Sequence, residues 1–250
     1  SIFKDVKGVS LHQVYGPHPA GNVGVQIGKI SPINAGERVW TVTPQDVATI
    51  GELFLTGKFN ATRTVALVGS EVKDAQYYNV ISGAAITDLV AGKIEGDNVR
   101  VISGDVLTGT KVKMDGNLGF LSNTVTVIPE GNVYRMFGWM PFASPSVHSA
   151  SRTGLSWLMP GKKYAPNTNL NGEERALVVT GEMEAVMPLD IFPMQLLKAC
   201  LASDIDKMES LGIYEVAPED FALIDYTNTS KLEAQQIIRE ALDLMIKEVG

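Results

Sequence analysis

Cysteine is nearly absent from this sequence, and its scarcity excludes several kinds of site. The 250 residues hold a single cysteine, Cys200, so the chain has no internal disulfide and no iron–sulfur or zinc centre built on several thiolates. Its neighbours in LLKACLAS predict a buried thiol on a helix. The three histidines, His12, His18 and His148, are too widely separated to form a recognisable metal-binding motif.

Long apolar runs and an excess of positive charge are also missing. No run approaches the roughly 18 to 20 apolar residues of a membrane-spanning helix, and we expect no signal peptide at the start of the chain. The 21 basic and 28 acidic residues give a formal charge of −7, which opposes nonspecific binding to nucleic acid or to an anionic bilayer. The composition includes 45% apolar and 20% charged residues. This balance is typical of a globular protein with one large domain or two to three small ones.

The segment 15–28, YGPHPAGNVGVQIG, carries the nucleotide-like pattern of the chain. It contains the G-x-x-x-x-G frame of a P-loop, but Asn22 and Val23 stand where that motif has Lys and then Ser or Thr. Its two prolines lack the amide hydrogens that a phosphate cradle needs, and its glycine spacing does not fit the dinucleotide-binding G-x-G-x-x-G. We therefore predict a rigid turn rather than a phosphate site.

The first third of the chain has an α/β pattern. Residues 9–15, 39–42 and 63–69 have the composition and alternation of strands. Thr43-Pro44-Gln45-Asp46 predicts the start of a helix, with an N-cap hydroxyl and a first-turn proline. The helix should end near Thr56-Gly57. This strand–helix–strand order is typical of an α/β fold.

From Gln76 onward the pattern changes to short extended segments with one helix. We expect extended segments over 77–81, 99–112 and 124–128, and a helix over 86–94. Hairpins crossed by a single helix fit a β-grasp, which is an α+β arrangement.

The last part of the chain is first irregular and then helical. Residues 137–172 are rich in Ser, Pro, Asn and Gly, which predicts a functional or loosely ordered stretch. Helices are predicted over 193–202 and 204–211, and the capping box Ser230-Lys-Leu-Glu233 predicts the start of a longer one. The apolar stripe that begins at Ile237 fits a core, with a partner-binding groove as the alternative.

Catalytic patterns are not evident in these residues. Ser146 and His148 with a nearby acid can be written as a triad, but the region lacks a nucleophile elbow. The acids Asp204, Asp206 and Glu209 fit a solvated helix face. We predict no catalytic residue and no metal ligand.

Six segments of the chain closely resemble a known family. They are GPHPAGNVG, VWTVTPQDVATIGELFLTGKF, NVRVISGDVLTG, NGEERALVV, MPLDIFPMQLL and PEDFALIDYTNTSK. In this order, and along nearly the whole chain, they resemble the A subunit of the bacterial sodium-translocating NADH:quinone oxidoreductase. Family members are considerably longer, so we expect this chain to correspond to the C-terminal part of one.

The resemblance implies a multidomain chain of α/β and α+β parts. Residues 1–72 would be the C-terminal part of a Rossmann-like domain and residues 73–136 a β-grasp domain of the soluble-ligand-binding type. Residues 137–250 would be an irregular linker followed by a helical, ferredoxin-like domain without clusters. The Rnf complex C subunit and the complex I flavin subunit are related to this family by the same order of domains.

The comparison with ferredoxin-type domains identifies positions where cluster ligands would stand. Such domains bind clusters through C-x₂-C-x₂-C-x₃-C-P. We aligned the first copy on Pro188 and the second on Asn228, and no cysteine falls on a ligand position. The positions are Leu177, Thr180, Met183, Met187, Pro218, Phe221, Ile224 and Asn228. We therefore expect a scaffold without iron that keeps packed side chains where clusters would lie.

The resemblance also implies a function. The chain would be part of a peripheral subunit on the cytoplasmic face of the bacterial inner membrane, in a complex that passes electrons from NADH to ubiquinone and exports sodium. FMN, FAD, riboflavin and iron centres are expected in partner subunits, and no nucleic acid partner is expected. The isolated fragment should be inactive. The alternatives are a scaffold that only docks onto other subunits, or a free-standing enzyme that acts through residues 137–172.

Ubiquinone is the ligand that the resemblance associates with this family. The head group of a quinone needs one or two hydrogen-bond donors in an apolar slot. The candidate residues for such a slot are Trp139, Phe142, His148, Arg152 and Trp157. The same patch would also serve as core or as a contact with another polypeptide.

Overall fold

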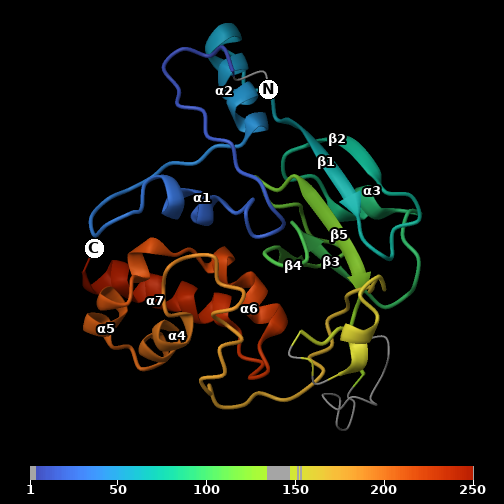
Figure 1. The fold of residues 1–250 in the computed structure, drawn as a ribbon. Coiled ribbons are helices and arrows are strands. Elements are labelled where there is room, and N and C mark those ends of the chain that lie inside the picture. The colour runs from blue at the N-terminus through green and yellow to red at the C-terminus, as the bar shows by residue number, and fades with distance from the viewer. Residues whose placement is uncertain (1–3, 134–146, 151, 153, 250) are drawn as a thin grey trace. The chain divides into compact units, whose positions relative to one another are not determined.

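The computed structural model describes residues 4–133, 147–150, 152 and 154–249 (Figure 1). Contacts divide the chain into two compact units. The helical unit comprises residues 1–39, 177–225 and 233–250, and the sheet unit comprises residues 40–176 and 226–232. Each unit has its own hydrophobic core.

A mixed five-stranded sheet forms the centre of the sheet unit. Its strands are β1 (Thr62–Val68), β2 (Gln76–Ile81), β3 (Val99–Ser103), β4 (Thr110–Val112) and β5 (Thr124–Pro129), in the spatial order β2-β1-β5-β3-β4. β1 runs antiparallel to β2 and parallel to β5, and β3 is antiparallel to both β4 and β5. The extended segments predicted from Gln76 onward are confirmed, and the one over 99–112 contains both β3 and β4.

The helix α3 (Ile86–Val90) packs on one face of this sheet. Alternation along β1 places Val65 and Leu67 on that face, where both are fully buried. They share a core with Ile86 and with residues of β3 and β5. α3 is shorter than the predicted 86–94, because the chain leaves the helix at Ala91, whose ψ is 118°, and then turns at Gly92, whose φ of 69° is left-handed.

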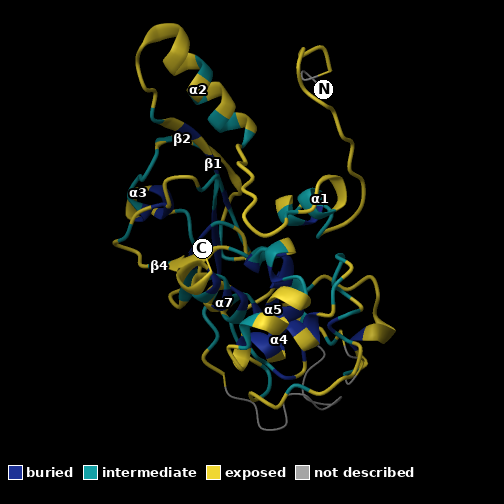
Figure 2. Cartoon of the chain, turned by 90° about the vertical axis from the view of Figure 1, so that its left-hand side faces the viewer, coloured by how far each residue is buried: buried dark blue, intermediate teal, exposed yellow. Residues whose placement is uncertain are grey.

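The helix α2 (Pro44–Thr56) begins and ends where the sequence predicts. The Thr43 hydroxyl accepts a hydrogen bond from the Asp46 N–H at 3.2 Å, and the Asp46 carboxylate accepts one from the Thr43 N–H at 3.3 Å. Gly57 ends the helix in the left-handed conformation. None of the helix residues is buried, and Figure 2 shows α2 as exposed or intermediate along its length.

Short helices make up the helical unit. They are α1 (Val23–Ile30), α4 (Pro193–Leu201), α5 (Ile205–Ser210), η2 (Ile213–Glu215), η3 (Pro218–Phe221), α6 (Ala222–Thr227), whose last two residues fall in the sheet unit, and α7 (Ala234–Glu248). The predicted helices over 193–202 and 204–211 are confirmed as α4 and α5. A further turn, η1 (Leu155–Leu158), lies in the sheet unit. Within the described ranges, no helix has both the length and the apolar character needed to span a membrane.

Two predicted strands do not form. Residues 9–15 and 39–42 have no strand partner in the described part of the chain. In the first of them Val9, Leu11 and Val14 are 48–57% exposed, so no buried sheet face exists for their alternation to match.

The predicted strand over 63–69 does form, but in a different setting. The resemblance grouped it with the Rossmann-like segment, whereas in the structure it is β1 and lies inside the five-stranded sheet. Its alternating buried residues need cover on one face, and α3 supplies that cover. The described chain is thus a mixed α/β structure with one five-stranded sheet. The domain boundaries at 72/73 and 136/137 stay predictions.

The predicted capping box at Ser230–Glu233 is wrong. α7 begins after Glu233, which makes no side-chain capping bond. Instead, the Asp225 carboxylate accepts hydrogen bonds from the backbone N–H groups of Ala234 and Gln235. Ser230 donates its hydroxyl to the Ala176 carbonyl at 3.2 Å. A carboxylate outside the predicted box therefore caps α7, because the predicted local cap is engaged elsewhere.

Candidate functional site

The Gly-rich segment 15–28 turns the chain and then enters α1. The Ala20 N–H donates to the Pro17 carbonyl at 3.0 Å, and the Asn22 N–H donates to the Pro19 carbonyl at 2.8 Å. Asn22 occupies the N-cap position of α1 but makes no side-chain capping bond. Its side-chain amide donates instead to the Glu219 carbonyl at 3.1 Å. The turn thus uses two of its backbone donors internally and joins α1 to η3.

A carboxylate of the protein itself lies at the N-terminus of α1. Asp220 is only 2% exposed, and it accepts a hydrogen bond from the Ala217 N–H at 3.0 Å. A Cβ at Gly24, in the first turn of α1, would overlap this carboxylate. Burial raises the pKa of Asp220, and the N–H groups of Ala217 and Val25 oppose that shift. An external phosphate would therefore meet an acidic group at this helix end.

Most of the predicted cluster-ligand positions lie together in the core of the helical unit. Five of them belong to one buried cluster or pack against it: Leu177, Met183, Met187, Phe221 and Ile224. Pro218 is buried in η3. Thr180 is exposed and Asn228 is buried in the sheet unit, so these two positions do not join the others. Hydrocarbon and thioether groups fill the space that the comparison assigned to clusters.

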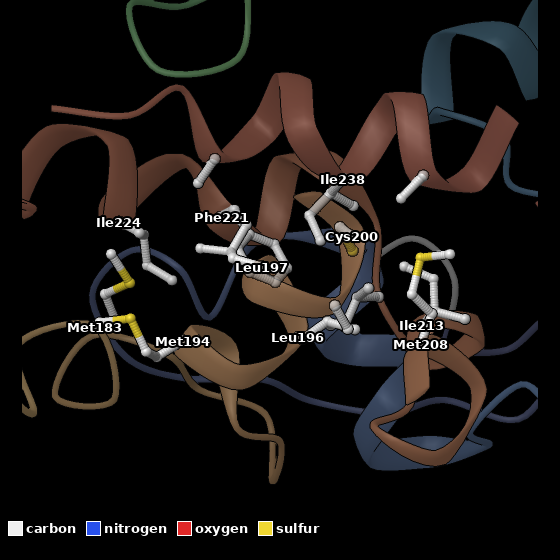
Figure 3. Packing of buried hydrophobic residues seen from close by; sticks show 14 of the residues in the cluster. Met183, Met194, Leu196, Leu197, Cys200, Met208, Ile213, Phe221, Ile224 and Ile238 are labelled. Atoms are coloured by element: carbon white, nitrogen blue, oxygen red, sulfur yellow. The ribbon is translucent and has the colours of Figure 1, made fainter. Parts of the chain in front are cut away.

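Sulfur in this core is present as thioethers and one thiol. Figure 3 shows Met183 beside Met194, and Cys200 in the same packed layer of side chains. Cys200 lies on α4 at 8% exposure, and burial raises the pKa of its thiol to about 11. The thiol is therefore protonated near neutral pH and is a weak nucleophile. Among the residues that the structure describes, no three His, Cys, Asp or Glu side chains are grouped so as to hold a metal ion.

The predicted quinone residues are only partly described. Trp139 and Phe142 lie outside the described residues. Arg152 is exposed and Trp157, on η1, is 53% exposed. Near them, the Ser149 N–H donates to the Ser156 hydroxyl at 2.9 Å.

His148 contacts two tyrosines that the sequence analysis did not select. Its Nδ1 lies 3.2 Å from the Tyr226 hydroxyl, and the two rings stack with centroids 5.8 Å apart. Tyr164 meets the imidazole edge-on at 5.3 Å. The Tyr164 hydroxyl is buried without a hydrogen-bond partner among the described residues. No sequence signal joins these three residues, since 78 positions separate His148 from Tyr226.

Two family models match parts of the chain. The model described as the NqrA second alpha/beta domain matches residues 1–59. The model described as the NQRA C-terminal domain matches residues 64–114, which contain most of β1 and all of β2, β3 and β4. Both models therefore describe pieces of the same NqrA polypeptide and occur here one after the other.

The A subunits of Na(+)-translocating NADH-quinone reductases are similar to this chain along nearly its whole length. The one from Neisseria meningitidis serogroup B is 39% identical over 241 residues, which are 96% of this chain and 54% of the relative. The one from Serratia proteamaculans has the same identity and the same coverage. The one from Hahella chejuensis is 38% identical over 239 residues, 94% of this chain and 53% of the relative. The chain spans about half the length of the curated relatives it matches.

These matches agree with the six segments that carried the resemblance. The matched stretch includes the Gly-rich turn, the sheet and the C-terminal helices, because it covers 96% of the chain. The family models reach the same polypeptide through two separate regions. The resemblance is thereby confirmed: along 96% of its length the chain is similar to about half of the A subunit of Na(+)-translocating NADH-quinone reductases.

Proposed function

We propose that this chain is part of a peripheral subunit of a respiratory complex that oxidises NADH, reduces ubiquinone and exports sodium. The observation that carries the proposal is its similarity, along 96% of its length, to the A subunit of a Na(+)-translocating NADH-quinone reductase. Its formal charge of −7 disfavours direct contact with an anionic bilayer. We therefore place the chain on the cytoplasmic face of the bacterial inner membrane, held there by other subunits.

Within the complex, the chain has a redox-silent role. A cluster needs thiolates, and methionine, phenylalanine and isoleucine side chains stand at the buried positions where thiolates would be. The carboxylate of Asp220, from η3, lies at the start of α1 and opposes a flavin or nicotinamide phosphate there. FMN, FAD, riboflavin and iron would then be bound by partner subunits.

The finer fold assignments are part of the same proposal. The strands β2 to β5 and the helix α3 lie within residues 73–136 and support a β-grasp of the soluble-ligand-binding type there. The sheet also takes in β1, which lies before residue 73 and pairs in parallel with β5. The match of residues 1–59 to a second alpha/beta domain supports the end of a Rossmann-like domain there. The cysteine-poor helical core supports a ferredoxin-like domain that has lost its clusters.

A docking scaffold that binds no small ligand is the second candidate, and the surface of α2 favours it. Trp40, Phe54 and Leu55 are 85–93% exposed on or beside a helix that has no buried residue. Large apolar side chains exposed together mark contact surfaces for other polypeptides.

A quinone-binding role is the third candidate, and the contacts of His148 favour it. The imidazole and the Tyr226 hydroxyl supply hydrogen-bonding groups, and the Tyr164 ring supplies an apolar wall. Leu155 and Trp157 on η1 are exposed and belong to the same unit. A quinone head could accept a hydrogen bond from this group and stack on its rings.

Membership of the complex is tested by reconstitution. The tagged chain is added to the detergent-solubilised complex from which the A subunit has been removed, and retention is measured. We expect stoichiometric retention of the chain, with no absorbance near 400 nm and no acid-labile sulfide of its own. Failure to be retained, together with NADH turnover by the isolated chain, would support the free-standing enzyme instead.

A quinone titration separates the second candidate from the third. Ubiquinone-1 is titrated while tryptophan fluorescence is recorded, for the natural chain and for His148→Ala. A saturable change that His148→Ala abolishes supports quinone binding, and Trp40→Ala serves as the control that should keep it. No saturable change would leave the docking scaffold as the role of the chain.

A further inference from the structure

The N-terminus of α1 lacks every local cap. Its N-cap residue, Asn22, uses its side chain on the Glu219 carbonyl instead of on the helix. The first turn of α1 contains no acidic residue. The first N–H groups of a helix need acceptors and carry partial positive charge. Asp220, far away in the sequence, lies against this turn: a Cβ on Gly24 would overlap its carboxylate, which also interacts with the Val25 N–H.

Asp220 is built into this position. The residue is 2% exposed, and its Oδ2 accepts a hydrogen bond from the Ala217 N–H. Its Oδ1 is buried and has no hydrogen-bond partner of ordinary geometry among the described residues. Both oxygens lie close to the first turn of α1, since a Cβ on Gly24 would collide with the carboxylate. A buried carboxylate is therefore directed at the start of α1, where the Val25 N–H and the Asn22 side chain face it.

Two glycines on one side of α1 allow this close approach. Gly24 and Gly28 are four residues apart and so lie on the same helix face. A Cβ on Gly28 would come within 2.8 Å of the Leu189 side chain. The glycine face thus lies directly against residues of the helical unit, and Asp220 is at its N-terminal end.

No cationic side chain is paired with the Asp220 carboxylate in the part of the chain that the structure describes. The nearest acid in sequence, Glu219, is paired with Arg239 of α7 at 3.3 Å. No ion pair involves Asp220 among the residues that the structure describes. The basic residue of α1, Lys29, is in its last turn, at the opposite end from Asp220. The helix N-terminus is therefore the positive feature that Asp220 faces.

We propose that the N-terminus of α1 is an oxyanion site that the protein fills with its own Asp220 carboxylate, and that this internal anion latches residues 22–30 onto the helical unit. The site excludes external anions while Asp220 is in place. When the carboxylate is removed, a small oxyanion of the formate or acetate class takes its position. The inference goes beyond the proposed function, because it assigns a ligand class to the turn that lacks the P-loop lysine.

Hydrogen exchange of the peptide 22–30 in the 250-residue chain tests the proposal. We expect Asp220→Gly to accelerate exchange in this peptide about tenfold, the shift expected when one cap is lost. Sodium formate should then slow the exchange again by several fold, and sodium chloride at equal ionic strength should not. The natural chain should respond to neither salt. Equal effects of formate and chloride on Asp220→Gly would overturn the oxyanion site.

Gly24→Ala tests the latch without touching the acid. The added methyl pushes α1 away from Asp220, so exchange of residues 22–30 should accelerate while formate has no effect. The matched control is Gly21→Ala, since no atom lies within 4 Å of a Cβ at Gly21. Unchanged exchange in Gly24→Ala would overturn the latch even if Asp220→Gly fails to fold. Protection of the α4 peptide 193–201 reports in every variant whether the helical core is intact.

Discussion

In the sheet unit, Asp46 and Glu130 each face an arginine, whereas in the helical unit Asp220 and Asp225 face the starts of helices. The Thr43 hydroxyl and then Arg63 lower the pKa of Asp46. Arg100 is the main group that lowers the pKa of Glu130, to about 2. Burial, in contrast, is the main cause that raises the pKa of Asp220 and Asp225.

In the sheet unit, donors that include an arginine outweigh the effect of desolvation on the pKa. In the helical unit, backbone N–H groups and the Gln235 amide do not outweigh it. Asp225 accepts hydrogen bonds from two backbone N–H groups and from the Gln235 amide, yet its pKa is raised. Glu130 accepts from Arg100, Lys111 and Thr168, and two of these donors are cations. The stabilities of the two units should therefore change with pH in opposite directions.

Each unit contains its own spectroscopic or chemical probe. Trp40, Trp139 and Trp157 all lie within residues 40–176 of the sheet unit, and the chain has no other tryptophan. Cys200 is buried in the core of the helical unit. Tryptophan fluorescence during denaturant unfolding thus follows the sheet unit, and labelling of Cys200 by 4,4′-dithiodipyridine follows the helical unit.

The largest effect is expected when the partner of Asp46 is removed. Arg63 is 5% exposed and donates to Asp46 at 2.7 Å and to Asn123 at 2.6 Å. Arg63→Met leaves a poorly solvated carboxylate without its cation, so the free energy of unfolding of the sheet unit should fall by about 3 kcal/mol. The fluorescence midpoint in urea measures this loss.

The double variant Arg63→Met/Asp46→Ala is the control for that prediction. It removes both charges and should recover part of the loss. The Cys200 labelling midpoint should stay unchanged in both variants. An equal fall in the labelling midpoint would show that the two units do not unfold separately, and the comparison would then fail.

The second largest effect is expected in the helical unit, from Asp225→Ala. The substitution leaves the N–H groups of Ala234 and Gln235 without their acceptor at a largely buried helix start. We expect a loss of about 2 kcal/mol in the free energy of unfolding, read from the Cys200 labelling midpoint. Asp225→Asn keeps an acceptor and removes the desolvated charge, so it should lose less. A larger loss for asparagine than for alanine would contradict this account.

The caps show how far the sequence alone predicts the fold. The box at Thr43 and Asp46 was predictable, because both partners lie within one helical turn and Pro44 reinforces the signal. The box at Ser230 has an equally good local pattern, yet Asp225 caps α7 and Ser230 bonds to Ala176. Local patterns located these helices, but they do not reveal which residue, distant in the sequence, accepts hydrogen bonds from the N–H groups at a helix start.

The candidate sites show the same limit. The missing lysine argues against a phosphate cradle at residues 15–28, but the carboxylate of Asp220 at α1 is invisible in the sequence. The aligned ligand positions around Met183 and Phe221 came from the comparison with ferredoxin-type domains that the resemblance suggested, and five of the positions do share one core. His148 was selected without Tyr164 and Tyr226, because no periodicity relates residues in separate segments.

A smaller and more diagnostic effect is expected from pH. The pKa values of Asp220 and Asp225 are raised above 3.8, so the folded helical unit binds protons more tightly than the unfolded chain. Their contribution to stability is fully present below that value and is lost as the pH rises through the folded pKa. For Glu130, the contribution is present above 4.5 and is lost as the pH falls toward about 2.

Denaturant unfolding at several pH values tests both predicted pH dependences, the one for the helical unit and the one for the sheet unit. As the pH falls from about 7 to about 4.5, the denaturant midpoint of Cys200 labelling should increase, while the midpoint of the fluorescence change should stay nearly constant. Below about pH 4.5 the fluorescence midpoint should decrease. In the Asp225→Asn variant the labelling midpoint should increase less as the pH falls. If the full increase persists both in this variant and in Asp220→Asn, groups other than these two aspartates cause it.

The smallest effect is expected from Lys111→Gln. Lys111 is 62% exposed, and its Nζ lies 3.2 Å from the Glu130 carboxylate, which Arg100 already binds through two nitrogens. Because an exposed ion pair contributes little, the fluorescence midpoint should correspond to a loss of less than about 0.5 kcal/mol, smaller still at high salt. Lys58→Gln, at an exposed lysine that forms no ion pair in the described chain, is the matched control. If Lys111→Gln instead costs as much as Arg63→Met, the number of cations around a carboxylate, rather than the burial of the pair, would set the stability of the sheet unit.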